Sequence, residues 1–172
     1  MNKLPKIKKI NKAVLNRRRT LSRLMAIQIF YQYNFLEHKK NIDEIKEDMI
    51  ESYALSPDDH ISSYRDKIDE EFLNNLILGL TLNEKIDEEI KEFLKDGFSL
   101  EKIEDVMQQI LRLGTFELKF MLDTPYKVII DEYVDIAACF YERKKVTFSN
   151  GILENLAKKF RAKDFIPFSP DN

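Results

Sequence analysis

The residues best suited to binding chemistry are the cations near the N-terminus. Residues 1–19 hold eight Lys or Arg and no acid. Both side chains attract phosphate groups, and arginine can bind one through two parallel hydrogen bonds. Cations at the start of a helix oppose its dipole, so helix stability does not explain them. The block favours nucleic-acid binding, with a solvated basic tail as the alternative: Arg17, Arg18, Arg19 and Arg23, preceded by five lysines.

A second candidate binding element lies near the other end of the chain. Phe148 and Asn150 come just after three cations, Arg143, Lys144 and Lys145. An aromatic ring beside cations can stack on an unpaired base, and an asparagine can hydrogen-bond to a base edge. The alternative is that Phe148 only opens an apolar stripe with Ile152, and the spacing alone favours that alternative.

The sequence shows no motif of an enzyme. It has no P-loop and no glycine-rich fingerprint, and no Ser or Cys has a credible His partner. The single cysteine, Cys139, excludes an intramolecular disulfide and a Cys/His zinc cluster. We expect Cys139 to be buried and unreactive in its apolar run, and Glu117, on another apolar stripe, to be a buried, paired structural residue. No catalytic residue, metal site or cofactor is predicted.

The composition is that of a folded globular protein. Of the 172 residues, 44% are hydrophobic and 34% charged, and no apolar run approaches the length of a membrane-spanning helix. One cysteine fits a reducing compartment, so we expect a cytoplasmic protein. The net charge of −2 is the sum of two unlike parts, because without the eight N-terminal cations residues 20–172 carry −10.

The spacing of apolar residues predicts an all-α protein, a compact bundle of about six or seven helices. Only four Gly and five Pro interrupt the chain, and no segment alternates long enough for a strand. We expect a mobile tail over 1–16, one domain over 17–166 and an irregular tail over 167–172. The expected helices cover about 18–37, 43–53, 66–95, 99–122, 125–140 and 148–160, with Asp96-Gly97 ending the third.

Three motifs together resemble the NusB family of bacterial transcription antitermination proteins. RRRTLSRLMAIQIFYQ at 17–32 is similar to the family's Arg-rich opening followed by A-x-Q-x-L-Y-Q. ILRLGTFELKFMLDTPYKVIIDEYVDIA at 110–137 is similar to I-L-R-L-(small)-x-(aromatic)-E-L followed by P-x-K-V-x-I-(N/D)-E-x-V. FSNGILENL at 148–156 is similar to F-V-N-G-V-L-(D/E). Their order and spacing match over about 17–160.

The resemblance implies a helical fold of two side-by-side sub-bundles, here about 17–96 and 97–166. It implies binding to the boxA element of ribosomal RNA leaders together with the ribosomal protein NusE. The pair would join RNA polymerase and other Nus factors and suppress premature termination. Tyr31, which matches the tyrosine of L-Y-Q, is expected near the partner surface. The RNA contacts implied by the resemblance or proposed from the residues are Arg18, Arg19, Arg23, Arg112, Phe148, Asn150, Lys144 and Lys145.

Three alternatives to this function stay open. A NusB-like domain also occurs ahead of an rRNA cytosine methyltransferase, but this chain ends where that catalytic domain would begin, so we expect no catalysis. A helical protein–protein adaptor with an inert basic tail is the main rival. A homodimer that hides the RNA surface is the third, and sedimentation over a dilution series would test it.

Overall fold

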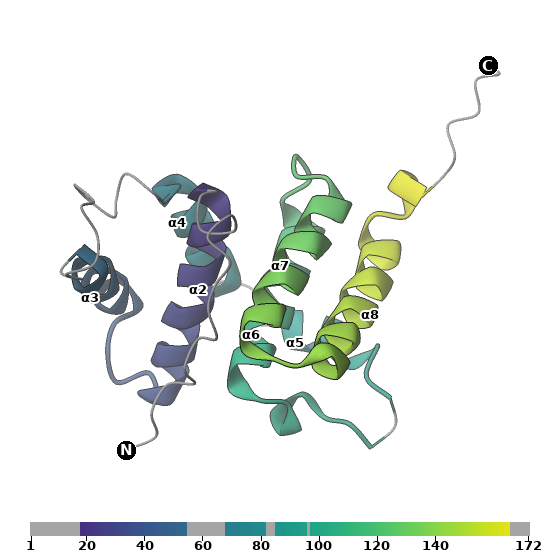
Figure 1. Ribbon diagram of the computed structural model, residues 1–172, viewed down its shortest axis with the longest axis horizontal. Helices are drawn as coiled ribbons and strands as arrows, with labels where there is room; N and C mark the ends of the chain where they lie inside the picture. The colour runs from purple at the N-terminus through teal and green to yellow at the C-terminus, as the bar shows by residue number, and fades with distance from the viewer. Residues whose placement is uncertain (1–17, 55–67, 82–84, 96, 166–172) are drawn as a thin grey trace. The chain divides into compact units, whose positions relative to one another are not determined.

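The fold is all-α, as predicted. A computed structural model describes residues 18–54, 68–81, 85–95 and 97–165 (Figure 1). These ranges hold seven α-helices, two short 3-10 helices and no strand. The expected tails at 1–16 and 167–172 lie outside them. No helix in the described ranges is long and apolar enough to cross a membrane.

The chain divides into two compact units, at residues 1–82 and 83–172. The division lies before the predicted boundary near residue 96. The prediction of a single helix over 66–95 is wrong, because the structure has a break within that range. The range contains two helices, α4 (Glu70–Thr81) in the first unit and α5 (Ile86–Lys91) in the second. The apolar spacing continued across the break because each helix contributes a stripe to the core of its own unit, and periodicity alone does not separate two such stripes.

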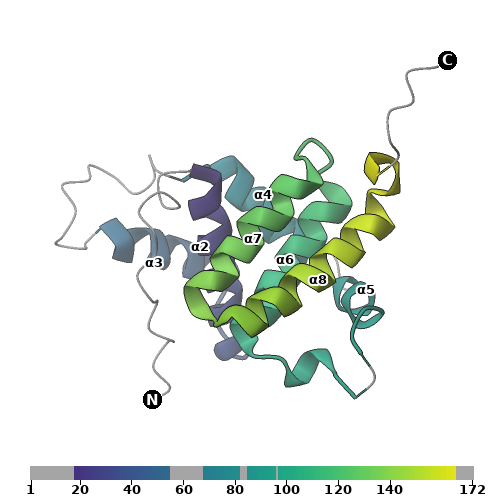
Figure 2. The same ribbon diagram turned by 45° about the vertical axis from the view of Figure 1, so that its right-hand side comes forward.

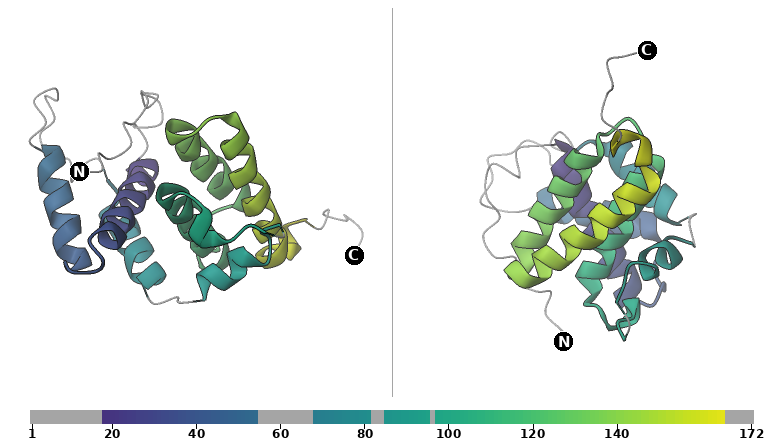
Figure 3. Two further views of the ribbon diagram at one scale, coloured as in Figure 1. Left: turned by 90° about the horizontal axis from the view of Figure 1, so that it is seen from below. Right: turned by 90° about the vertical axis from the view of Figure 1, so that its right-hand side faces the viewer.

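In the first unit, helix α2 (Arg18–Phe35) packs against both α3 (Ile42–Ala54) and α4. The N-terminal half of α2 is buried almost all round, which is typical of a central helix. The side chain of Asn41 caps α3, since its Oδ1 accepts a hydrogen bond from Asp43 N at 2.8 Å. Figure 3 shows these helices from two further sides.

In the second unit, α6 (Asp105–Phe120) is the central helix. It packs against α5, α7 (Tyr126–Phe140) and α8 (Arg143–Phe160), and α7 also packs along α8 (Figure 2). The only glycine of α6 is Gly114, which occupies the small position of the second motif. A Cβ there would lie 2.8 Å from Leu153 Cδ2 and 3.3 Å from Tyr133 Cδ2. The small residue thus lets α7 and α8 approach α6 closely.

Two predicted helix starts are corrected. The segment after Ser99 forms a 3-10 helix, η2 (Leu100–Lys102), and the extended backbone of Ile103 separates it from α6. The last helix begins at Arg143 rather than Phe148, so Lys144 and Lys145 lie in its first turn. A cationic first turn opposes the helix dipole and masked this start in the sequence.

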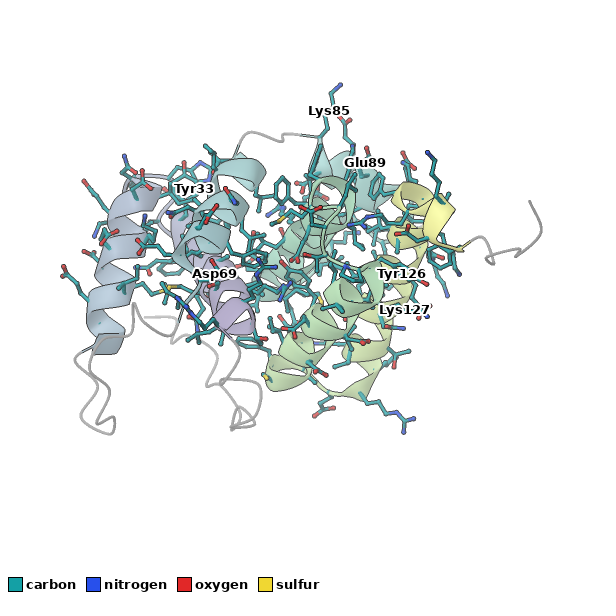
Figure 4. The ribbon with its side chains drawn as sticks, turned by 90° about the horizontal axis from the view of Figure 1, so that it is seen from above. Tyr33, Asp69, Lys85, Glu89, Tyr126 and Lys127 are labelled. Carbon is teal, nitrogen blue, oxygen red and sulfur yellow. The ribbon has the colours of Figure 1, made fainter. Side chains whose placement is uncertain are left out.

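Ion pairs connect α5, α6 and α8 at Glu89, which is labelled in Figure 4. The carboxylate accepts hydrogen bonds from Lys119 Nζ and Lys159 Nζ, each at 2.5 Å. The bond from Lys119, and then that from Lys159, lowers the pKa of Glu89 below its ordinary value of 4.5. Lys159 also pairs with Glu92 at 2.6 Å.

Glu89→Gln is expected to reduce the free energy of unfolding by about 1 kcal/mol at neutral pH. The pKa of Glu89 is lowered in the folded state, so its stabilisation is complete above 4.5 and is lost as the pH falls through the lower folded value. Urea denaturation from pH 7 to pH 3 measures this, with the exposed neighbour variant Glu88→Gln as control. A deficit in Glu89→Gln that stays constant down to pH 3 would contradict the assignment.

Candidate nucleic-acid interface

The arginines at the start of α2 are held against the start of α4. Arg18 Nε and Nη2 donate to the carbonyl oxygen of Ile68 at 3.2 and 2.9 Å. Arg19 Nε donates to Asp69 Oδ2 at 3.1 Å. Both arginines remain exposed to solvent. They connect the two helices and still present charge outward.

Asp69, which sequence reasoning did not single out, organises this junction (Figure 4). Its Oδ1 accepts a hydrogen bond from Phe72 N at 3.0 Å, and Ser22 Oγ accepts one from Asp69 N at 2.9 Å. The Phe72 amide, followed by the Arg19 guanidinium, lowers the pKa of Asp69 below 3.8. The carboxylate thus caps α4 and partly neutralises the arginine block. Sequence reasoning could have found Asp69 from its position, because an acid directly before a helix is a common N-cap.

Arg23 differs from the other two arginines because it is buried, with 2% of its surface exposed. Its guanidinium carbon lies 4.9 Å from the centre of the Phe72 ring, a cation–π contact. Arg19 lies over the same ring at 5.0 Å. A contact between Arg23 and RNA stays a prediction, but in this structure its side chain supports the helix pair while Arg18 and Arg19 face solvent.

Arg112 connects two helices of the second unit. Its Nε and Nη2 donate to the two carboxylate oxygens of Asp87 on α5, both at 2.7 Å. The side chain is half-buried, at 20% exposure. This two-point pair is the strong kind of charged contact, and it leaves little of the guanidinium for a second ligand. Asp87 was missed because it lies in an acidic segment that reads as a solvated helix face.

Four predicted RNA contacts lie together on the first half of α8. Lys144 is exposed, whereas Lys145 Nζ pairs with Glu104 Oε2 at 2.6 Å and lies 5.3 Å from the ring centre of Tyr141. Asn150 Nδ2 donates to Glu154 Oε1 at 3.0 Å, one turn further along the helix. The fourth is Phe148. No acid lies in the first turn of α8, so this end of the helix presents positive charge.

Phe148 is half-buried and pairs with a second aromatic residue, Phe98. Their ring centres lie 6.4 Å apart with 30° between the planes. Phe98 is 61% exposed and follows Gly97, whose φ of +85° belongs to a turn. Sequence reasoning missed Phe98. An aromatic residue directly after a glycine expected to end a helix was the signal by which it could have been found.

Tyr31, the predicted partner residue, lies on the second half of α2. Its ring stacks on that of Phe35, with centres 6.4 Å apart and 12° between the planes. Phe35 is 56% exposed, so the pair presents apolar surface to solvent. The partner assignment stays a prediction.

Other candidate residues for chemistry are accounted for structurally. Glu117 is fully buried, as expected for a structural residue. Cys139 is half-buried rather than buried, because it lies near the end of α7, and its Sγ donates to Asp135 O. Burial and the nearby Asp135 carboxylate raise its thiol pKa, which disfavours the reactive thiolate. Among the described residues no group of His, Cys, Asp and Glu could hold a metal ion.

Comparison with known proteins gives a consistent result. The family model described as "NusB family" matches residues 20–158. The chain belongs to the NusB family. A transcription antitermination protein NusB from Bradyrhizobium sp. strain BTAi1 is 34% identical over 151 residues, covering 87% of each chain. Its counterpart from Caulobacter vibrioides is 32% identical over 156 residues, covering 83% of this chain and 94% of the relative.

Solved NusB structures share the fold. NusB from T. maritima superposes with a TM-score of 0.68 and 29% identity, covering 85% of this chain and 94% of that one. A NusB chain solved with NusE and double-stranded RNA has a TM-score of 0.66 at 22% identity, covering 82% and 96%. The second likeness supports the fold alone. Family membership makes this chain a transcription antitermination factor of the NusB type.

Proposed function

We propose that this NusB-family protein binds boxA-type leader RNA together with ribosomal protein NusE and suppresses premature termination in rRNA operons. It would do so in the cytoplasm, as part of an RNA polymerase complex with other Nus factors, and without catalysis. The observation that carries the proposal is the cationic, acid-free first turn of α8 directly beside the Phe148–Phe98 pair. The choice of ligands follows from family membership, since a NusB protein has been solved together with NusE and double-stranded RNA.

The physical mechanism is charge neutralisation followed by base stacking. Exposed Arg18, Arg19 and Lys144 release counterions from the RNA phosphates, which makes the affinity salt-dependent. Phe148 stacks on a splayed base, a contact worth about 1–3 kcal/mol. The Asn150 amide gives up its hydrogen bond to Glu154 and forms one to a base edge instead. Arg23 and Arg112 remain proposed RNA contacts, although each guanidinium also has a partner within the fold.

The acidic remainder of the chain suits the proposed protein partner. Residues 20–172 carry a net charge of −10, after the eight N-terminal cations are removed from the total of −2. Ribosomal proteins are basic, so opposite charge would speed their association. The same negative charge would repel RNA from the other faces of the molecule.

Removing the charges at the start of α8 is expected to weaken RNA binding and its salt dependence. The variant is Arg143→Gln combined with Lys144→Gln. Both side chains are exposed, so the fold should be unaffected. The slope of log affinity against log salt is negative, and each lost phosphate contact should reduce its magnitude by about 0.7. Filter binding of a boxA-type RNA at several salt concentrations measures the slope.

Lys158→Gln is the matched control, because Lys158 is an exposed lysine in the last turn of the same helix. It should leave the slope unchanged. A slope that is equal in all three proteins, with NusE binding retained, would favour the adaptor without specific RNA binding. Charge reversal of Arg18 and Arg19 is a poorer test, since it would also break their bonds to the start of α4.

A further inference from the structure

Phe98 lies on the surface although nothing in its own segment requires an aromatic residue there. Its backbone N donates to Lys95 O at 2.9 Å, and Gly97 makes the turn. The segment is anchored two residues later by Leu100, which is only 1% exposed. Phe98 itself is 61% exposed. The fold therefore fixes its backbone and leaves its ring accessible.

The ring of Phe98 extends the aromatic surface of Phe148. The ring centres are 6.4 Å apart, near the upper limit for an aromatic pair, and the planes differ by 30°. At this distance the pair leaves Phe98 61% exposed, while Phe148 is half-buried. An exposed ring beside a partly exposed one forms a surface on which neighbouring bases of an unpaired strand can stack.

The charge around the pair favours an anionic ligand. Exposed Lys95 and Lys102 flank Phe98 along the chain, and Lys144 lies one helical turn before Phe148. Two of the nearby acids are each paired with a lysine: Glu101 with Lys91 at 3.1 Å and Glu104 with Lys145 at 2.6 Å. An apolar peptide would gain nothing from these lysines, whereas a phosphate backbone would.

We propose that Phe98 is a second base-stacking residue, and that with Phe148 it binds two neighbouring unpaired bases of a single RNA strand. The inference rests on the proposed function and refines it: the ligand at this point is single-stranded, since paired bases have no free faces. A duplex of the same sequence is expected to bind without any contribution from Phe98.

The test uses the full chain and a single-stranded boxA-type RNA carrying 2-aminopurine, with a hairpin duplex of the same sequence as a second probe. Phe98→Leu should weaken single-strand binding roughly 5- to 100-fold and reduce the quenching of 2-aminopurine. Phe98→Tyr should restore both, because it keeps the aromatic face. Phe120→Leu is the matched control, since Phe120 is an exposed phenylalanine of the same unit, at 46%.

The outcomes separate this inference from the proposed function. If Phe98→Leu binds the single strand as the unchanged protein does while Phe148→Leu does not, the inference is wrong and RNA binding stands. If Phe98→Leu loses NusE instead of RNA, the pair is a protein contact and the inference is again wrong. If neither variant matters and scrambled RNA binds equally well, both the inference and the proposed function fail. Equal loss of the hairpin and the single strand would also contradict the inference.

Discussion

Arg161→Ala is expected to lower the free energy of unfolding by about 3 kcal/mol, because it leaves buried carbonyls without donors. Arg161 follows α8 and is only 6% exposed. Its Nε donates to Leu118 O at 2.7 Å and its Nη2 to Met121 O at 3.0 Å. Weaker bonds at 3.3 Å reach Leu122 O and Thr124 O. The guanidinium thus caps the C-terminus of α6, where a positive charge also suits the helix dipole.

Urea denaturation followed by circular dichroism measures this loss. Arg161→Lys should recover part of it, because an ammonium keeps the charge but does not reproduce the planar set of donors. Lys163→Ala is the control, since Lys163 is exposed nearby, and it should change stability by less than about 0.5 kcal/mol. A loss below about 1 kcal/mol in Arg161→Ala would mean that water replaces the guanidinium and that the cap contributes little.

Gly114→Val is expected to cost about 3 kcal/mol by overpacking the second unit. The Cβ alone would lie 2.8 Å from Leu153 Cδ2, and both Leu153 and Tyr133 are fully buried. A Cβ closer than 3.0 Å forces its neighbours to shift, so we expect α6 and α8 to move apart. Because α8 carries Phe148, RNA binding is expected to fall together with stability.

Gly151→Ala is the matched control on α8. A Cβ at Gly151 meets nothing within 4 Å. The exchange should therefore stabilise the protein by up to about 1 kcal/mol through helix propensity alone. Thermal unfolding of both variants measures the contrast. Equal effects of the two substitutions would show that the close approach at Gly114 is not required.

Periodicity predicted the helical class and most elements because each apolar stripe lines a core. The stripe of Ile110 and Leu113 marks α6 as buried, and Ile130 and Ala137 mark α7. Periodicity failed where two stripes follow each other in register, as in α4 and α5, and where charge opposes the helix, as at Lys144. The first failure merged two helices into one, and the second misplaced the start of a helix that was predicted.

The candidate site was less predictable because the partners of a charged residue lie far away in sequence. Arg18 and Arg19 reach Ile68 and Asp69, fifty positions on. Arg112 reaches back to Asp87. From residue type alone, every arginine is a candidate phosphate ligand. Only the three-dimensional contacts show which arginines are already bound to partners within the fold.

The most direct test of the central claim is the affinity of this chain, mixed with NusE, for boxA-type RNA and for a scrambled RNA of equal length. Filter binding at one fixed salt concentration gives both affinities, with the chain alone as reference. The account predicts that boxA-type RNA binds at least tenfold more tightly than the scrambled RNA, a difference of about 1.4 kcal/mol. NusE should increase this preference. Equal affinity for the two RNAs, with and without NusE, would contradict it.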